Sequence, residues 1–124
     1  MIAVGTAVLI AAVVAAAFGV LRRRYLTVAV TGTSMLPTLM AGDRVLVRRL
    51  RNRRLRLGQL VVANRPDPGG QTVLVVKRVG AVETPPGTVT LLGDNAANSR
   101  DSRHWGPCPR DQVLGVVVTI FDRR

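Results

Sequence analysis

The first 21 residues form one unbroken apolar segment. Residues 1–21 carry no charged side chain and consist mainly of Ala, Val, Ile and Leu. At about 1.5 Å per residue, a helix of this length spans the roughly 30 Å hydrocarbon core of a bilayer. The pattern therefore predicts one N-terminal transmembrane helix over residues 1–21. A cleaved secretory signal is the alternative, but its basic residues would precede the apolar region, whereas Arg22–Arg24 follow it here.

After the arginines, apolar and polar positions alternate in short β-branched runs. These runs predict strands over Leu26–Val30, Arg44–Arg49, Gln59–Ala63, Thr72–Val82, Thr88–Leu92 and Val113–Phe121. Turn formers separate the runs, most clearly in residues 64–70. Residues 50–57 are expected to be a loop or short helical turn, and residues 93–110 an irregular loop. The sequence thus predicts a mainly β fold: a small antiparallel β-barrel-like domain after one N-terminal transmembrane α-helix.

The division that follows has three parts. Residues 1–21 are the helix, and residues 22–30 are a basic juxtamembrane segment with the first strand. Residues 31–124 form one domain, long enough for a single hydrophobic core of modest size.

The charge balance is strongly basic. The net charge is +11, and seven arginines fall between Arg44 and Arg56. Such a patch suits nucleic acid or an anionic membrane surface. Because aromatic residues make up only 3% of the chain, few side chains are available to stack on bases. With a predicted span nearby, anionic lipid headgroups are the favoured partner and no nucleic acid is expected. A solvated charged face explains the arginines equally well.

Cysteine usage limits the possible chemistry. A single cysteine, Cys108, excludes an internal disulfide and a multi-cysteine metal site. The sequence offers no ligand cluster, so neither a metal nor a cofactor is expected.

One lysine stands among 18 basic residues, and a serine lies in a Gly- and Pro-containing turn upstream. Arginine stays charged at working pH, whereas a buried lysine can lose its proton. Strand alternation places Val73, Val75 and Lys77 on one face, so Lys77 is expected to point at apolar neighbours, which lowers its pKa. A neutral amine and Ser34 would form a nucleophile–base pair. The alternatives are a structural serine and a lysine that reaches solvent or pairs with a carboxylate.

The polar loop over residues 93–106 supplies the third element. Asp101 and Arg103 are placed to pair and hold the loop in one shape. A hydroxyl from Ser99 or Ser102 would then orient the lysine amine. A plain surface loop of turn formers is the alternative.

Four motifs together are similar to those of type I signal peptidases, in the family's order. Ser34-Met35-Leu36-Pro37-Thr38 resembles the SMxPT nucleophile motif, and Gly42-Asp43-Arg44-Val45-Leu46-Val47 resembles the second box. Val76-Lys77-Arg78 resembles the lysine box, and residues 93–106 resemble GDN…NSxDSRxWG. The chain is therefore identified as a member of this family, of the short single-anchor bacterial type.

The resemblance implies a serine endopeptidase that removes N-terminal signal peptides from exported preproteins. Ser34 would be the nucleophile, Lys77 the general base, and the Ser34 backbone N–H an oxyanion donor. Ser99 would orient Lys77, Asp101 and Arg103 would shape the site, and Met35 would line the cleft. Polypeptide precursors, bound as an added strand and cut after small side chains, would be the substrates.

Three features depart from the family pattern. Gly32 stands where many members carry a hydroxyl for the oxyanion hole. Gly80-Ala-Val-Glu83 replaces the usual glycine-rich PGD, and the short spacing to the last box leaves no room for a second β domain. The family places its catalytic domain outside the cytoplasmic membrane, whereas Arg22–Arg24 predict that the domain stays inside.

The same residues suggest other functions. A Ser34–His104–Asp101 triad requires a histidine only three residues from its aspartate, and a Cys108–His104 pair has less support. A penicillin-binding SxxK site is excluded by Pro37, and self-cleaving repressors lack both the span and Pro37-Thr38. A maturation protease dedicated to one precursor and an inactive basic membrane-anchored binding module remain open.

Overall fold

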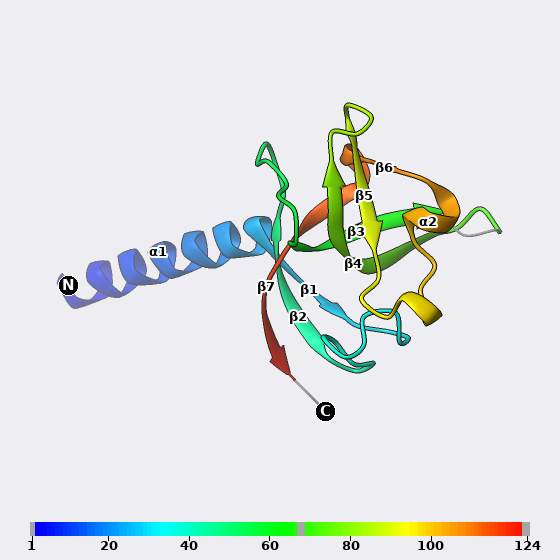
Figure 1. Ribbon diagram of the computed structural model, residues 1–124. Helices are drawn as coiled ribbons and strands as arrows, with labels where there is room; N and C mark the ends of the chain where they lie inside the picture. Colours follow the sequence, from blue (N-terminus) through cyan, green and yellow to red (C-terminus); the bar gives the residue numbers. More distant parts are fainter. Residues whose placement is uncertain (1, 67–68, 123–124) are drawn as a thin grey trace.

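The computed structural model describes residues 2–66 and 69–122 and contains one long helix followed by a β domain (Figure 1). The helices are α1 (Ile2–Arg24) and α2 (Ser102–Trp105), with 3-10 turns η1 (Ala96–Asn98) and η2 (Arg110–Gln112). The strands are β1 (Tyr25–Ala29), β2 (Arg44–Arg49), β3 (Leu60–Pro66), β4 (Thr72–Val82), β5 (Thr88–Leu92), β6 (Cys108–Pro109) and β7 (Val113–Asp122). The predicted mainly β class with one N-terminal apolar helix is confirmed.

Helix α1 extends away from the β domain and buries none of its described residues (Figure 1). It continues to Arg24, three residues beyond the predicted end, because arginine favours helix and a cation stabilises the last turn. Its 23 residues give a length of about 35 Å. Within the described chain it is the one helix long and apolar enough to cross a membrane.

The strands form one antiparallel sheet in the order β1-β2-β7-β3-β4-β5-β6. Strand β7 joins the two halves, because its first residues pair with β3 and most of its length pairs with β2. Register shifts in these pairings bend the sheet, so β1 and β2 curl away from β3, β4 and β5 (Figure 1). β1 and β6 are the two ends of the strand order, so the sheet is curled but open.

Two buried clusters fill the curled sheet. The first lies between β3, β4, β5 and β7 and includes Val61, Val79 and Leu91. The second is built from β2, one residue each of β3 and β4, and the segment that joins β1 to β2, and Met35 and Leu39 of that segment are both buried in it. The connection that carries the predicted nucleophile is thus part of the core.

The strand bounds of β2, β4 and β5 match the predicted ones, and β1 and β3 differ by a few residues. Part of the predicted turn at residues 64–70 is strand, because β3 continues through Pro66; residues 67–68 lie outside the described ones. Residues 93–110 were wrongly predicted to be wholly irregular. They contain η1, α2 and β6, and α2 begins at an Asp101 cap that His104 completes as a capping box.

Candidate active site

A rigid turn carries Ser34 between β1 and β2. The Val30 N–H donates to the Asp43 carbonyl at 2.8 Å, and the Gly42 N–H donates back to the Val30 carbonyl at 2.9 Å, closing the base of the segment. Its middle is anchored by the buried Met35 side chain. Ser34 itself is half-buried. The turn therefore presents the serine from a fixed support.

The loop after β5 packs directly on this turn. The Asn95 N–H donates to the Ser34 carbonyl at 2.8 Å, and the Asn95 amide donates to the Thr33 carbonyl at 3.0 Å. Gly93 lies at the point of closest approach. A Cβ there would fall 2.8 Å from the Ser34 carbonyl oxygen and 2.0 Å from Ser99 Oγ. Only glycine fits between the two serines.

Lys77 is buried in the middle of β4, with 3% of its surface exposed. Its Nζ donates to Ser99 Oγ over 3.1 Å. Burial lowers the pKa of the Lys77 amine, Arg65 and Arg103 repel its proton further, and the Asp101 carboxylate opposes them in part. The net effect favours the neutral amine, the form that can accept a proton.

Asp101 holds Ser99 in place. The Ser99 hydroxyl donates to Asp101 Oδ2 at 2.7 Å, the Gly93 N–H donates to the same oxygen at 2.8 Å, and Arg103 Nε donates to Oδ1 at 3.0 Å. Burial alone would raise the pKa of the Asp101 carboxyl, but these hydrogen bonds hold it well below its usual range. The carboxylate stays ionised and directs the Ser99 oxygen lone pairs toward Lys77.

A second ion pair, which the sequence analysis did not identify, ties three segments together. Arg78, next to Lys77, donates to both oxygens of Asp94 at 2.8 and 2.7 Å. The Thr38 hydroxyl donates to the same carboxylate, and hydrogen bonds from Arg78 lower the Asp94 pKa. Arg78 and Asp94 both fall inside the motifs, so their positions were visible in the sequence, but their pairing depends on the strand register.

Ser34 and Lys77 line one small cleft of about 60 Å³. One wall is formed by Val28–Thr31 and the other by Leu74–Val76; Met35 also contributes. No hydrogen bond joins the Ser34 hydroxyl to the Lys77 amine among the described residues. The fold thus brings the serine and the lysine to the same cleft, with the amine held on Ser99.

The competing residues lie elsewhere. His104 is about half exposed and is absent from the lining of the cleft, and its Nδ1 accepts from the Asp101 N–H at 3.4 Å. A triad requires Nδ1 to donate to the carboxylate instead. The Ser102 hydroxyl accepts from the Leu91 N–H at 2.8 Å and does not orient the lysine. Burial raises the pKa of the Cys108 thiol, which opposes a thiolate nucleophile.

Comparison with known proteins gives a consistent family. The model of "Signal peptidase, peptidase S26" matches residues 1–84 and 82–121. The mitochondrial ATP-independent inner membrane protease subunit 1a of Arabidopsis thaliana is 35% identical over 74% of this chain and 67% of its own length. Mitochondrial inner membrane protease subunit 1 of Schizosaccharomyces pombe is 33% identical over 71% of this chain and 68% of its own.

A third relative is named as a signal peptidase and not as a mitochondrial protease subunit. The probable signal peptidase I-1 of Synechocystis is 31% identical over 71% of this chain and 66% of its own length. This chain therefore spans about two thirds of the length of the curated relatives that it matches. Since the family model covers nearly the whole chain, the protein belongs to the S26 signal peptidase family of serine peptidases.

Proposed function

We propose that Ser34 is the nucleophile and Lys77 the general base of a membrane-anchored endopeptidase. The observation that carries this proposal is the arrangement of Lys77, Ser99 and Asp101 beside the cleft that Ser34 also lines. A buried amine with a lowered pKa, oriented by a hydroxyl and placed in the same cleft as a second serine, has the composition of a base with its nucleophile.

The reaction would proceed through an acyl-enzyme. The Lys77 amine takes the Ser34 hydroxyl proton while Oγ attacks the scissile carbonyl, and the resulting ammonium gives this proton to the departing amine. Water then attacks the ester while the lysine takes a proton from it, and the ammonium gives that proton to Ser34 Oγ as the bond to the product acyl group breaks. The Ser34 backbone N–H makes no hydrogen bond within the described chain, so it is available to the oxyanion. Gly32, with φ of +76°, adds no side-chain donor.

Free strand edges favour an extended polypeptide substrate. Strand β4 pairs with β5 only from Arg78 onward, and β1 pairs only with β2 in the described sheet. The edge of residues 72–77 therefore faces the end of β1 across the cleft. A substrate strand could hydrogen-bond to these edges. Because the cleft is small and lined by Val28, Val76 and Met35, it favours small apolar side chains beside the scissile bond.

The substrate we infer is an N-terminal signal peptide of an exported preprotein. The Synechocystis relatives, named probable signal peptidases I, support this inference. A dedicated maturation protease for one precursor is the second candidate, supported by the relatives named mitochondrial inner membrane protease subunits. Residues 31–124 would be the minimal catalytic core in either case, without a second β domain, and no metal or cofactor enters the mechanism.

We further propose a single-pass protein of the cytoplasmic membrane with the β domain on its outer face. Protease added to intact cells should then digest the β domain, whereas in inverted vesicles the domain should be protected. Digestion only in inverted vesicles would place the domain in the cytoplasm, as the flanking arginines predict.

The catalytic proposal is tested with paired serine and threonine variants. Purified full-length protein in detergent is assayed on a precursor with an Ala-x-Ala site. Ser34→Ala should abolish cleavage. Thr33→Ala, which removes an exposed hydroxyl one residue away, should leave the rate within about twofold. Undiminished cleavage by Ser34→Ala would mean that Ser34 is not the nucleophile, or that a contaminating protease cleaves the precursor.

A further inference from the structure

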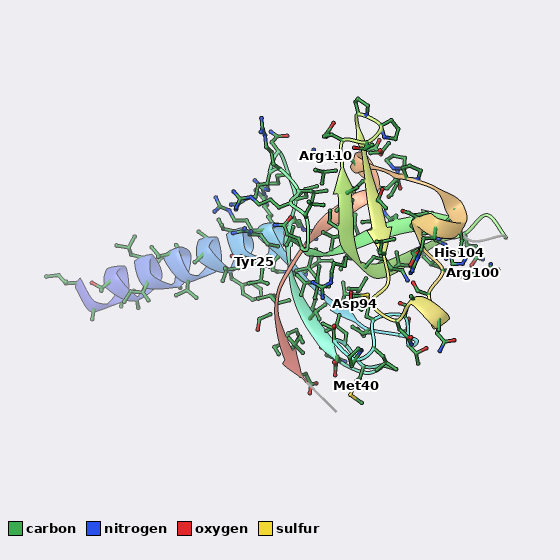
Figure 2. All side chains as sticks on the ribbon, viewed as in Figure 1. Tyr25, Met40, Asp94, Arg100, His104 and Arg110 are labelled. Carbon is green, nitrogen blue, oxygen red and sulfur yellow. The ribbon has the colours of Figure 1, made fainter. Side chains whose placement is uncertain are left out.

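Five arginines and one tyrosine line an open pocket where α1 meets the β domain. The pocket has a volume of about 400 Å³, and its lining residues are Arg24, Tyr25, Arg48, Arg49, Arg51 and Arg53. They come from the end of α1, from β1 and β2, and from the turn after β2. In Figure 2, Tyr25 marks this junction, and nitrogen-tipped side chains gather beside it.

The turn that contributes Arg51 and Arg53 is fixed by the core. The Leu50 N–H donates to the Leu114 carbonyl at 2.9 Å, and the Arg53 N–H closes the turn on the Leu50 carbonyl at 3.1 Å. The Leu50 side chain is buried, and Arg110 donates to the Arg53 carbonyl. The guanidinium groups therefore stand on a supported backbone, and their convergence does not come from a mobile tail.

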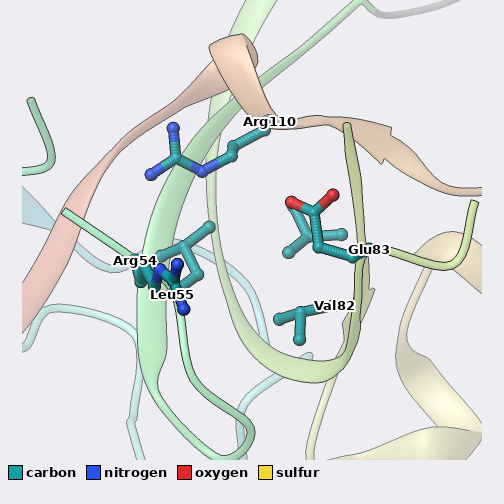
Figure 3. Close-up of a pocket in the computed structure, with 6 residues that line it drawn as sticks. Arg54, Leu55, Val82, Glu83 and Arg110 are labelled. Carbon is teal, nitrogen blue, oxygen red and sulfur yellow. The ribbon is translucent and has the colours of Figure 1, made fainter. Parts of the chain in front are cut away.

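A neighbouring pocket shows a different charge balance. Figure 3 shows Arg54 and Arg110 facing the Glu83 carboxylate across an opening of about 390 Å³. Glu83 is itself held there, because it accepts from the Gly87 N–H at 2.9 Å. The Glu83 carboxylate therefore supplies a negative charge within that pocket.

The arginine pocket has no such compensation. None of its lining residues is acidic, and within the described chain none of its five arginines forms an ion pair. Five cations around one opening repel each other, so the arrangement favours a bound anion. Guanidinium groups match phosphate oxygens in bidentate geometry.

We propose that this pocket binds the phosphate of an anionic phospholipid headgroup where α1 leaves the bilayer. Its position selects this source of phosphate, because Arg24 is the last residue of the apolar helix. Tyr25, the next residue, is of a type enriched at membrane interfaces. Nucleic acid is disfavoured, since Tyr25 is the one aromatic side chain in the lining.

Headgroup binding would anchor the β domain as well as the helix. Tyr25 is paired with Arg48 across β1 and β2, so the strand that leads toward Ser34 would be fixed relative to the lipid surface. It would also give Arg24 and the turn arginines a role separate from setting the topology of the helix.

Matched double variants test the proposal. Full-length protein in nonionic detergent is titrated with short-chain phosphatidylglycerol, and bound lipid is measured by native mass spectrometry. Arg49→Gln with Arg53→Gln removes two pocket cations. Arg54→Gln with Arg56→Gln removes the same charge from positions outside the pocket. At about fivefold per arginine, the pocket pair should weaken binding about 25-fold and the control pair less than about threefold.

Parallel titrations with other ligands identify the ligand and the cause of any loss of lipid binding. Short-chain phosphatidylcholine, inorganic phosphate and a single-stranded oligonucleotide are titrated in parallel, and all three should bind at least tenfold more weakly. Equal losses in both double variants would overturn the proposal in favour of diffuse charge. Equal or tighter binding of inorganic phosphate or the oligonucleotide would overturn it in favour of those ligands. Precursor cleavage should be unchanged in both double variants. Unchanged cleavage would show that both variants fold, and it would separate the lipid-binding proposal from the catalytic proposal for Ser34 and Lys77.

Discussion

A methyl group at Gly93 should disturb both the packing and the geometry of the candidate site. Replacing Gly93 with Ala places a Cβ 2.0 Å from Ser99 Oγ, 2.5 Å from Ser99 Cβ and 2.8 Å from the Ser34 carbonyl oxygen. Non-bonded contacts of a Cβ do not fall below 3.0 Å, so Ser99 has to move by about 1 Å or more. Ser99 is fixed on Asp101 and holds the Lys77 amine, so this movement passes to the proposed base.

The expected effects are on both stability and rate. Overpacking of this kind costs about 1–3 kcal/mol, which lowers the melting temperature of a domain of this size by roughly 5–20 °C. A displacement of about 1 Å in catalytic geometry costs on the order of 100-fold in rate. Thermal unfolding of the detergent-solubilised chain and kcat on the precursor, measured below the lowered melting temperature, report the two effects separately.

Gly80→Ala is the matched control. A Cβ at Gly80 would lie 2.6 Å from Leu92 Cδ1, the far end of a flexible side chain that can rotate away. This variant should cleave the precursor within about twofold of the wild-type rate. If Gly93→Ala were as stable and as active as the unchanged protein, the packing of Ser99 between Gly93 and Lys77 would be refuted.

Three further substitutions test the candidate site, each assayed by cleavage of the same precursor. Ser99→Ala removes the acceptor for Lys77 Nζ and should lower kcat about 10- to 100-fold with little change in KM; an unchanged kcat would show that the lysine is oriented otherwise. Arg65→Gln removes a cation that lowers the Lys77 pKa, so that pKa rises. If the neutral amine is the reactive form, as proposed, the acid limb of kcat/KM should move to higher pH, and a shift to lower pH would contradict the assignment. His104→Ala should retain cleavage within a few-fold, since His104 does not line the cleft and only completes the capping box of α2; total loss would revive the triad.

The strands that the sequence predicts best are those with clear alternation and strong turn residues at both ends. In β2, Val45 and Val47 are buried while Arg44 and Arg49 are exposed, and the predicted bounds agree with the structure. The short elements β6 and α2 were missed because one depends on a tertiary pairing and the other is a single capped turn. β6 has two residues and exists through its pairing with β5, and α2 is a single turn stabilised by the Asp101 cap.

In the candidate site too, local sequence predicts some features and the fold alone determines others. Lys77 was singled out because it is the only lysine, and it lies in the part of β4 where Val76 and Val79 are also buried, although the start of that strand is exposed. Local sequence could not choose between Ser99 and Ser102, since both lie near Asp101 and only the fold shows that Ser102 contacts the β5 backbone. The pairing of Arg78 with Asp94 could not be predicted either, because it depends on the register between β4 and β5.

The pH dependence of cleavage by a Lys77→Arg variant tests the central claim most directly. Arginine keeps the positive charge but cannot release its proton to serve as a base at working pH. Single-turnover cleavage of the precursor is measured between about pH 6 and 10 for both proteins, with thermal unfolding as the check on folding. We expect the wild-type rate to rise with pH as the Lys77 amine loses its proton, and the variant to show no cleavage at any pH. A folded variant that cleaves with the wild-type rate and pH profile would contradict the assignment of Lys77 as the base.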